Sequence, residues 1–170
     1  WGPGTRYHLE NFREALDSPG EWFLNRDGVL SYMPLPGEDM SNAEVVAPVL
    51  GELVRLAGDA ESGKWVEHIT FKGLAFQHTQ YLLPPEYAES VWNGFEIPAA
   101  LVAEGVRGVT LERCEVAHTA GSAVRFRKGS RDSLVQRCHM YDLGGSGVVI
   151  GDSGAAAGPE LAARGFIVDN

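Results

Sequence analysis

The sequence predicts an all-β protein built as a parallel β-helix, a solenoid in which each turn of the chain adds one layer of strands. The first observation is an internal repeat, because Leu111–His118 returns as Val135–Asp142, and Cys114 returns at the same spacing as Cys138. The spacing lies in the range of about 20 to 50 residues that is typical of solenoids. The second observation is that short runs of alternating apolar residues, broken by Gly and Ser, fill each repeat, which predicts strands and turns.

The repeat extends in both directions when two insertions are allowed. Upstream, Ile69–Thr79 matches Val109–Thr119 at a wider spacing, so an inserted loop follows His78. Downstream, Arg164 is the counterpart of Arg131, and the extra length between them lies in a stretch rich in Gly and Ala. We therefore expect two of the repeats to carry loops that stand outside the stacked strands.

The chain is expected to have two parts. Residues 1–52 do not follow the repeat and form a predicted cap-like segment, whereas residues 53–170 form the predicted β-helix. The chain begins at Trp1 without Met and ends at Asn170 within a predicted strand, so we expect it to be an excerpt of a longer protein with further repeats, because a solenoid end needs protection of its strand edges.

Short elements are predicted in the first part. The capping-box spacing of Asn11–Glu14 predicts a short helix that Ser18–Gly20 terminates. Alternating residues on both sides of Asn25–Gly28 predict a β-hairpin. Val45–Leu50 and Leu53–Leu56 are both strand-like, and we expect the second of these to belong to the earliest repeat.

Composition limits the classes of partner. The chain has 170 residues and 44% hydrophobic content, which is enough for one core. Its formal charge of −9 argues against nucleic acid, because phosphate backbones are bound by basic surfaces. No apolar run of about 18 residues predicts a membrane span, and no signal peptide is visible.

The two cysteines occupy equivalent positions of successive repeats, about 4.8 Å apart by strand spacing. That separation alone would permit a disulfide. Stacked side chains of parallel strands point the same way, however, so we expect Leu74, Cys114 and Cys138 to form one inward column with both thiols reduced. The redox compartment stays open.

Three segments carry a resemblance to a known group of proteins. Ala15–Phe23, Leu30–Pro34 and Val66–Thr79 resemble bacterial right-handed parallel β-helix carbohydrate-active enzymes, and the chain is most similar to glycoside hydrolase family 141. The resemblance covers nearly the whole chain. It implies a right-handed coil, an α-L-fucosidase or xylanase type of activity, a role in polysaccharide degradation and a secreted or periplasmic bacterial location. It assigns no individual catalytic residue here.

Stacking the repeats places His78, His118 and Asp142 in one column at the end of a strand. Neighbours in such a column are about 4.8 Å apart, so an imidazole can hydrogen-bond the carboxylate beside it. We predict Asp142 as a catalytic or substrate-contacting acid, His118 as its orienting catalytic partner and His78 as a substrate contact. The alternative is a polar turn ladder that satisfies local backbone groups.

The inserted loop begins directly after this column. It carries Tyr81 and Trp92, whose flat faces suit the C–H surfaces of sugar rings, and long loops in compact domains are often functional. We therefore predict that Tyr81 and Trp92 bind substrate. The alternative is that these aromatic side chains only anchor the loop on the strands.

Glycoside hydrolysis usually requires two carboxyl groups, about 5 to 5.5 Å apart for retention and 6.5 to 9.5 Å apart for inversion. Asp142 is the best candidate for one of them, and its counterpart in the following repeat would lie beyond Asn170. Glu115, which precedes His118 on the same predicted strand, is expected to face the substrate, with a solvated strand-face carboxylate as the alternative.

A column of three arginines, Arg107, Arg131 and Arg164, would suit an acidic polysaccharide. Adjacent acids such as Glu104 and Asp132 offer ordinary neutralisation instead, and we expect a solvated turn ladder.

Another column, Glu104, Lys128 and Asp152, alternates in sign, which supports stacking. No Cys and His spacing indicates zinc. No metal site or cofactor is predicted, although acidic turns leave calcium open.

The sequence thus predicts a glycoside hydrolase that cleaves an oligo- or polysaccharide by acid/base chemistry at carboxylates. A polysaccharide lyase is one alternative. A non-catalytic carbohydrate-binding or structural β-helix protein is the other, because a fold does not determine an activity.

Overall fold

The structure of the chain is a computed structural model, and it describes residue 4 and residues 12–82, 97–152 and 162–169. Contacts divide the chain into two units, Trp1–Val45 and Val46–Asn170. The predicted division at residue 52 stays a prediction. Strands dominate the described residues, and none of the helices among them has the length and apolar character that a membrane crossing requires.

The first unit contains the predicted hairpin. Strands β1 (Trp22–Leu24) and β2 (Leu30–Tyr32) pair antiparallel. The Asn25 side-chain oxygen accepts hydrogen bonds from the backbone N–H groups of Asp27 and Val29, which closes the turn. The expected helix is a single 3₁₀ turn, η1 (Arg13–Ala15), without a side-chain cap, and the predicted capping residue Asn11 lies outside the described residues. A second 3₁₀ turn, η2 (Met40–Asn42), is capped by Asp39.

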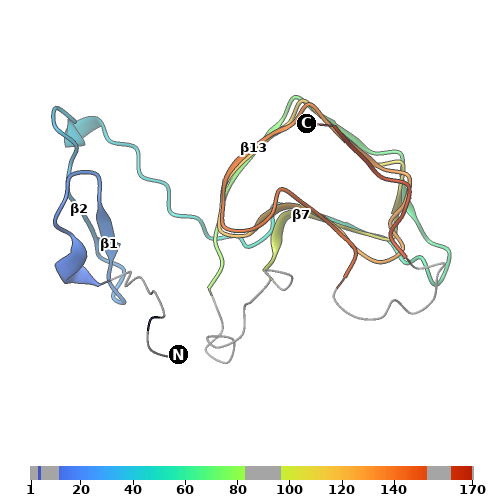
Figure 1. Cartoon of the computed structure of the whole chain (residues 1–170), viewed down its shortest axis with the longest axis horizontal. Helices are drawn as coiled ribbons and strands as arrows, with labels where there is room; N and C mark the ends of the chain where they lie inside the picture. Colours follow the sequence, from blue (N-terminus) through green and yellow to red (C-terminus); the bar gives the residue numbers. More distant parts are fainter. Residues whose placement is uncertain (1–3, 5–11, 83–96, 153–161, 170) are drawn as a thin grey trace. The chain divides into compact units, whose positions relative to one another are not determined.

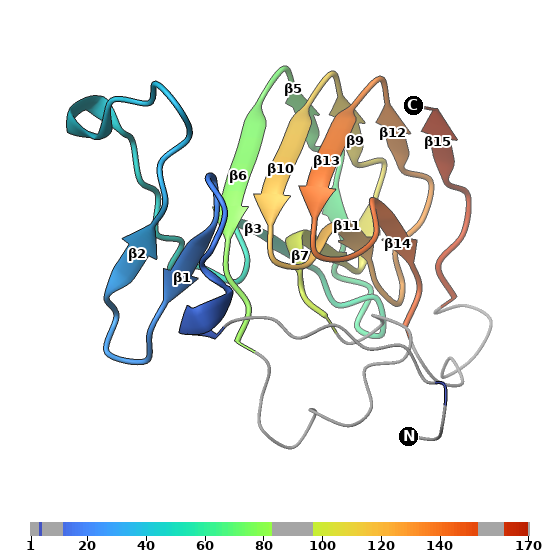
Figure 2. The same ribbon diagram turned by 60° about the vertical axis from the view of Figure 1, so that its left-hand side comes forward.

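The second unit is built from strands that pair in parallel, as the sequence predicts. They form sheets with the orders β14-β11-β7-β3, β15-β12-β9-β5, β13-β10-β6 and β4-β8, seen from the side in Figure 2. In chain order the strands are β3 (Val54–Ala57), β4 (Val66–Glu67), β5 (Thr70–Lys72), β6 (Ala75–Thr79), β7 (Ala99–Glu104), β8 (Val106–Arg107), β9 (Thr110–Glu112), β10 (Glu115–Thr119), β11 (Ser122–Phe126), β12 (Leu134–Gln136), β13 (His139–Leu143), β14 (Val148–Ile150) and β15 (Ile167–Asp169).

The strand register follows the sequence repeat. Glu115 pairs with His139 and with Ala75, which hold the equivalent positions of the following and the preceding repeat. Leu134 pairs with Ile167 across the second predicted insertion. Figure 1 shows later passes of the chain following the path of earlier ones. A shift of one residue would turn every side chain to the opposite face, so this register decides which residues share a surface.

The core lies between the sheets and is densest where a repeat has neighbours on both sides. Val106, Val116 and Phe126 are all fully buried. The prediction that Leu74 belongs to the core is wrong, since its side chain is 48% exposed. Leu74 precedes β6, an edge strand of its sheet, so its column continues through Cys114 on one side only.

Cys114 and Cys138 are buried thiols, and no disulfide joins them. The Cys138 Sγ–H donates to the backbone oxygens of Leu111 and Gln136. Burial raises the pKa of the Cys138 thiol, which favours its neutral form. The predicted inward placement of both cysteines is confirmed, and their reduced state stays a prediction.

The prediction of a strand at Val45–Leu50 is wrong. The segment is irregular, and Val49 is 76% exposed. Among the described residues, its backbone hydrogen bonds are with Gln80. The Gln80 backbone N–H donates to the backbone oxygen of Leu50, and the Gln80 side chain donates to the backbone oxygen of Val49. An apolar pattern without a neighbouring strand to pair with does not make a strand. The prediction of a strand at Leu53–Leu56 is confirmed for most of the segment, since β3 contains Val54–Leu56 and pairs with β7.

Candidate functional site

The candidate site lies on the outer face of the sheet formed by β6, β10 and β13, which stand side by side in Figure 2. Its central column consists of His78, His118 and Asp142, which all have positive φ angles of 65°, 53° and 49°. Asn, Asp and His are the non-glycine residues that most readily adopt this left-handed conformation. Ladder pairing skips these positions, because Ala117 pairs with Tyr141 and Thr119 with Leu143.

The central column makes the contacts that stacking predicts. Nδ1 of His118 lies 2.6 Å from Oδ2 of Asp142. On the opposite side, the imidazole rings of His78 and His118 stack with centroids 5.1 Å apart and an interplanar angle of 10°. The side chains of His118 and Asp142 are 41% and 71% exposed, so the pair is open to a ligand from solvent.

A carboxylate and its two hydrogen-bond donors lie beside the central column. Oε1 of Glu115 accepts hydrogen bonds from Nε2 of Gln77 at 2.5 Å and from the Tyr141 hydroxyl at 3.2 Å. Glu115 therefore lies on the predicted face, but two neighbouring strands hold it in place. Partial desolvation and the charge of Glu115 raise the pKa of Tyr141, so its hydroxyl stays a proton donor at neutral pH.

Aromatic rings surround the His118–Asp142 pair. The Tyr141 ring meets the His118 ring edge-on at 5.6 Å between centroids and lies 4.5 Å from the His139 ring. Tyr141 is 36% exposed, so part of the ring remains accessible. A partly exposed aromatic surface beside polar groups is suited to sugar rings, which have apolar faces and hydroxyl edges.

Sequence reasoning missed Gln77, His139 and Tyr141. The signal was available, because residues two apart on a strand face the same side and Glu115 was already assigned to that face. Gln77 and Tyr141 are the register partners of Ala117, which lies two positions after Glu115.

The predicted loop residues add little to this geometry. Tyr81 is half-buried and follows β6, and within the described part of the chain no hydrogen bond or ring contact joins it to the central column. Trp92 lies outside the described residues. The described residues also contain no group of three or more His, Cys, Asp or Glu side chains placed to hold a metal ion.

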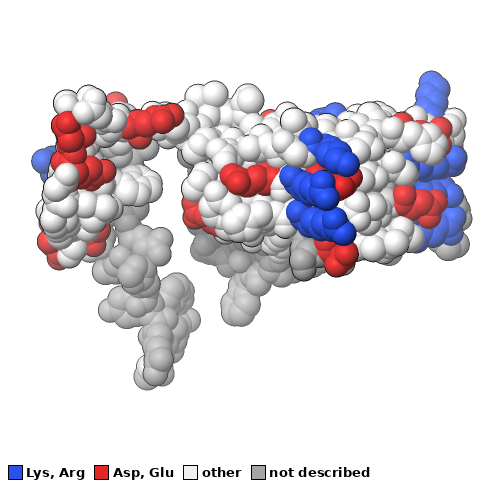
Figure 3. All heavy atoms as spheres, turned by 90° about the horizontal axis from the view of Figure 1, so that it is seen from above, with Lys and Arg blue, Asp and Glu red and all other residues white. Residues whose placement is uncertain are grey.

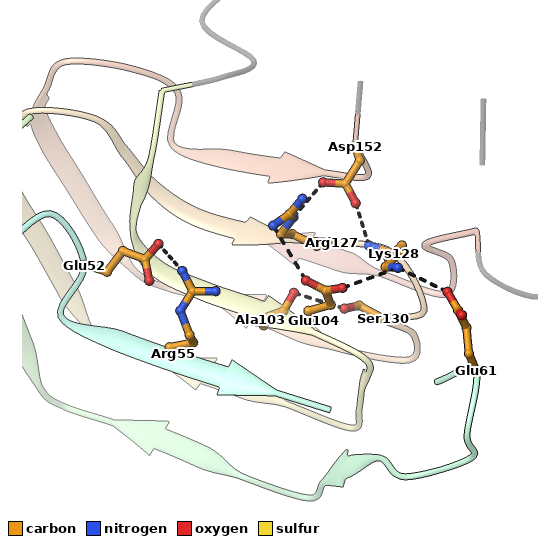
Figure 4. A network of polar contacts seen from close by, with 9 residues as sticks. All are labelled: Glu52, Arg55, Glu61, Ala103, Glu104, Arg127, Lys128, Ser130 and Asp152. Carbon is orange, nitrogen blue, oxygen red and sulfur yellow. Dashed lines mark hydrogen bonds and ion pairs between the residues drawn. The ribbon is translucent and has the colours of Figure 1, made fainter. Parts of the chain in front are cut away.

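A second polar cluster lies at the end of β7 and the following turns (Figure 4). Glu104 contacts Arg127 at 3.6 Å and Lys128 at 3.8 Å, Asp152 pairs with Arg127 at 2.8 Å, and Lys128 reaches Glu61 at 3.1 Å. The predicted column of alternating sign is therefore present. A hollow of about 150 Å³ beside it is lined by Gly58, Asp59, Ala60, Glu61, Glu104 and Lys128. Because these charges neutralise one another, we assign the cluster a structural role.

Comparison with known proteins gives no matching family model, no matching curated protein and no matching solved structure. The His118–Asp142 pair provides a carboxylate whose orientation is held by an imidazole N–H, on an open face flanked by aromatic rings. Such a carboxylate can accept a proton or a hydrogen bond from a bound hydroxyl.

Proposed function

We propose that this chain forms part of a right-handed parallel β-helix protein that hydrolyses glycosidic bonds of an oligo- or polysaccharide, in the manner of an α-L-fucosidase or xylanase. The outer face of β6, β10 and β13 would hold the sugar. The parallel pairing of equivalent positions in successive repeats supports this coil. A secreted or periplasmic bacterial setting belongs to the same proposal.

The observation that carries the proposal is the 2.6 Å contact between His118 and Asp142 on an exposed face. The proposed catalytic group is the Asp142 carboxylate, acting as base or nucleophile toward the sugar. His118 fixes its orientation through the Nδ1–H group. His78, stacked on His118, and the Tyr141 ring would contact the sugar ring beside the reacting bond.

Glycoside hydrolysis also calls for a proton donor to the leaving group. Glu115 is a poor choice for this role, because its Oε1 already accepts hydrogen bonds from Gln77 and Tyr141, which hold the carboxylate between neighbouring strands. In the proposal the second carboxyl group therefore comes from outside the described residues, and Glu115 positions Tyr141 and binds substrate.

The test is turnover by the full-length protein on fucosylated and xylan substrates, with Asp142→Asn beside Asp132→Asn. Asp132 is a matched control, because it is also an exposed aspartate with a positive φ, 54°, at a turn outside this column. We expect Asp142→Asn to lower kcat by about 100-fold or more and Asp132→Asn to leave kcat within about twofold. Equal activity of the two variants would remove Asp142 from the mechanism.

One observation favours a second candidate, a non-catalytic carbohydrate-binding protein. The rings of His78, His118, Tyr141 and His139 form a continuous series of contacts, which suits binding as well as catalysis. The same assay separates the candidates. A hydrolase releases reducing ends, a lyase releases unsaturated products that absorb in the ultraviolet, and a binding protein retains the polymer without turnover.

A further inference from the structure

A column of charged residues runs along the β4-β8 sheet and the turns that follow it. Glu67 on β4 pairs in register with Arg107 on β8, and Arg107 bridges to Arg131, which bridges to Arg164. Successive members are about 4.8 Å apart along the stack. One acidic position is thus followed by three basic positions, and we name Arg107, Arg131 and Arg164 the arginine ladder.

Among the described residues, neither Glu104 nor Asp132 forms an ion pair with the arginine ladder. Glu104 pairs with Arg127 and Lys128 instead. Arg107 has one carboxylate partner, Glu67, at 3.3 Å, and among the described residues no carboxylate forms an ion pair with Arg131 or Arg164. Figure 3 shows Lys and Arg side chains gathered in two groups on one face of the second unit. Positive charge is therefore concentrated locally in a chain whose formal charge is −9.

Trp65 holds two of the guanidinium groups in place. The guanidinium carbons of Arg107 and Arg131 lie 3.8 Å and 4.2 Å from the centre of the Trp65 ring. Such cation–π contacts fix the planes of both groups and reduce their contact with water. Nε of Arg107 is buried and has no hydrogen-bond partner among the described residues. Both cations are thus ordered by an aromatic ring, and in the described part of the chain Arg107 alone of the two has a carboxylate partner.

We propose that the arginine ladder is a binding site for an acidic polysaccharide, a polyuronate whose carboxylates pair with successive guanidinium groups. Guanidinium forks bind carboxylates through two parallel hydrogen bonds. A regular row of cations matches a linear polymer with one charge per sugar better than a single small anion. The overall negative charge opposes nucleic acid, whose binding depends on extended basic surface.

The site is separate from the His118–Asp142 pair, because the arginine ladder belongs to β8 and its equivalents and the pair belongs to β10 and β13. The inference rests on the proposed function only for its choice of a polysaccharide as ligand. Binding is measured without turnover, so Asp142→Asn should retain affinity for polyuronate even where it abolishes hydrolysis.

The experiment is titration calorimetry of the full-length protein with a galacturonate oligomer and with a neutral xylan oligomer of similar length. The test variant is Arg131→Gln/Arg164→Gln. Its matched control is Arg113→Gln/Arg137→Gln, which removes two exposed arginines near Glu112. We expect about a tenfold or greater loss of galacturonate affinity in the test variant, less than about a twofold loss in the control, and weaker wild-type binding as salt rises.

Three results would overturn the proposal. They are no galacturonate binding by the wild type, equal losses in the two double variants, or tighter binding of inorganic phosphate or a DNA oligomer than of galacturonate. The single variant Arg164→Gln, which leaves Trp65 and its two contacts intact, guards against misfolding of the double variant. It should lose affinity in the same direction while its circular dichroism spectrum stays that of the wild type.

Discussion

Nδ1 of His118 lies 2.6 Å from Oδ2 of Asp142, although the two residues are a full repeat apart in the chain. The contact arises because both residues stand at the same left-handed position of successive repeats. An exposed carboxylate without such a donor would sample several rotamers. The hydrogen bond therefore makes His118 a positioning residue in the proposed mechanism.

Substitutions of His118 test this role. His118→Ala removes the donor, and we expect kcat to fall about tenfold with KM changed less than twofold, which corresponds to one charge-assisted hydrogen bond. His118→Asn should restore most of kcat, because the amide N–H can take the place of Nδ1–H and Asn tolerates positive φ. A change in KM without a fall in kcat would contradict this positioning role. A failure of His118→Asn to restore kcat would contradict it as well. Steady-state kinetics on the preferred substrate provide the measurement.

The Arg127–Asp152 pair predicts a pH dependence of stability. Burial alone would raise the pKa of Asp152, but hydrogen bonds from Arg127 and the Lys128 backbone outweigh it and hold the pKa below the ordinary 3.8. The stabilisation is therefore complete above pH of about 4. It is lost as pH falls through the lowered pKa.

Asp152→Asn should accordingly cost about 1 kcal/mol of unfolding free energy at pH 7, with the difference from wild type shrinking as pH falls below about 4. Urea unfolding at a series of pH values measures it. Asp27→Asn, on an exposed turn, serves as the control and should show no such trend. A difference that stays constant with pH would mean that the ion pair is not its source.

Phe126 tests the packing of the core. Its side chain is fully buried, and its ring centroid lies 4.8 Å from that of Phe166 in the next repeat. Phe126→Ala should lower the unfolding free energy by about 3 to 5 kcal/mol. Val49→Ala, at a side chain that is 76% exposed, should change it by less than about 0.5 kcal/mol. Thermal and urea unfolding measure both variants. If Phe126→Ala lowered the unfolding free energy by less than Val49→Ala does, the packing of this core would be contradicted.

The state of the two cysteines is open to direct titration. Both thiols are buried, and the raised pKa of Cys138 further lowers its thiolate content. We expect a thiol reagent to react slowly with the native protein and to count two thiols per chain after unfolding without reductant. A count of zero after unfolding would demonstrate a disulfide.

The register was predictable because two independent signals in the sequence determine it. A constant spacing aligns Cys114 with Cys138, and the period of two within each strand decides which side chains point inward. The N-terminal hairpin was predictable from turn chemistry at Asn25 and Gly28. These are local or periodic signals, and the sequence contains them in full.

Other features depend on neighbours that local sequence does not specify. Val45–Leu50 has a strand-like pattern, but none of the described strands pairs with it. Leu74 has a core-like pattern, but it precedes an edge strand. The central column of the site was predictable from stacking. The strand period also places Gln77 and Tyr141 on the face of Glu115, but their hydrogen bonds to Glu115 depend on side-chain reach across strands, which the sequence does not specify.

The central claim is that equivalent residues of successive repeats lie side by side, since the site exists only in that register. Nuclear Overhauser contacts between backbone protons of parallel strands test it most directly. We expect contacts that align Glu115 with His139 and with Ala75. Contacts that align Glu115 with Met140, one residue out of step, would place His118 and Asp142 on different faces and rule out this register.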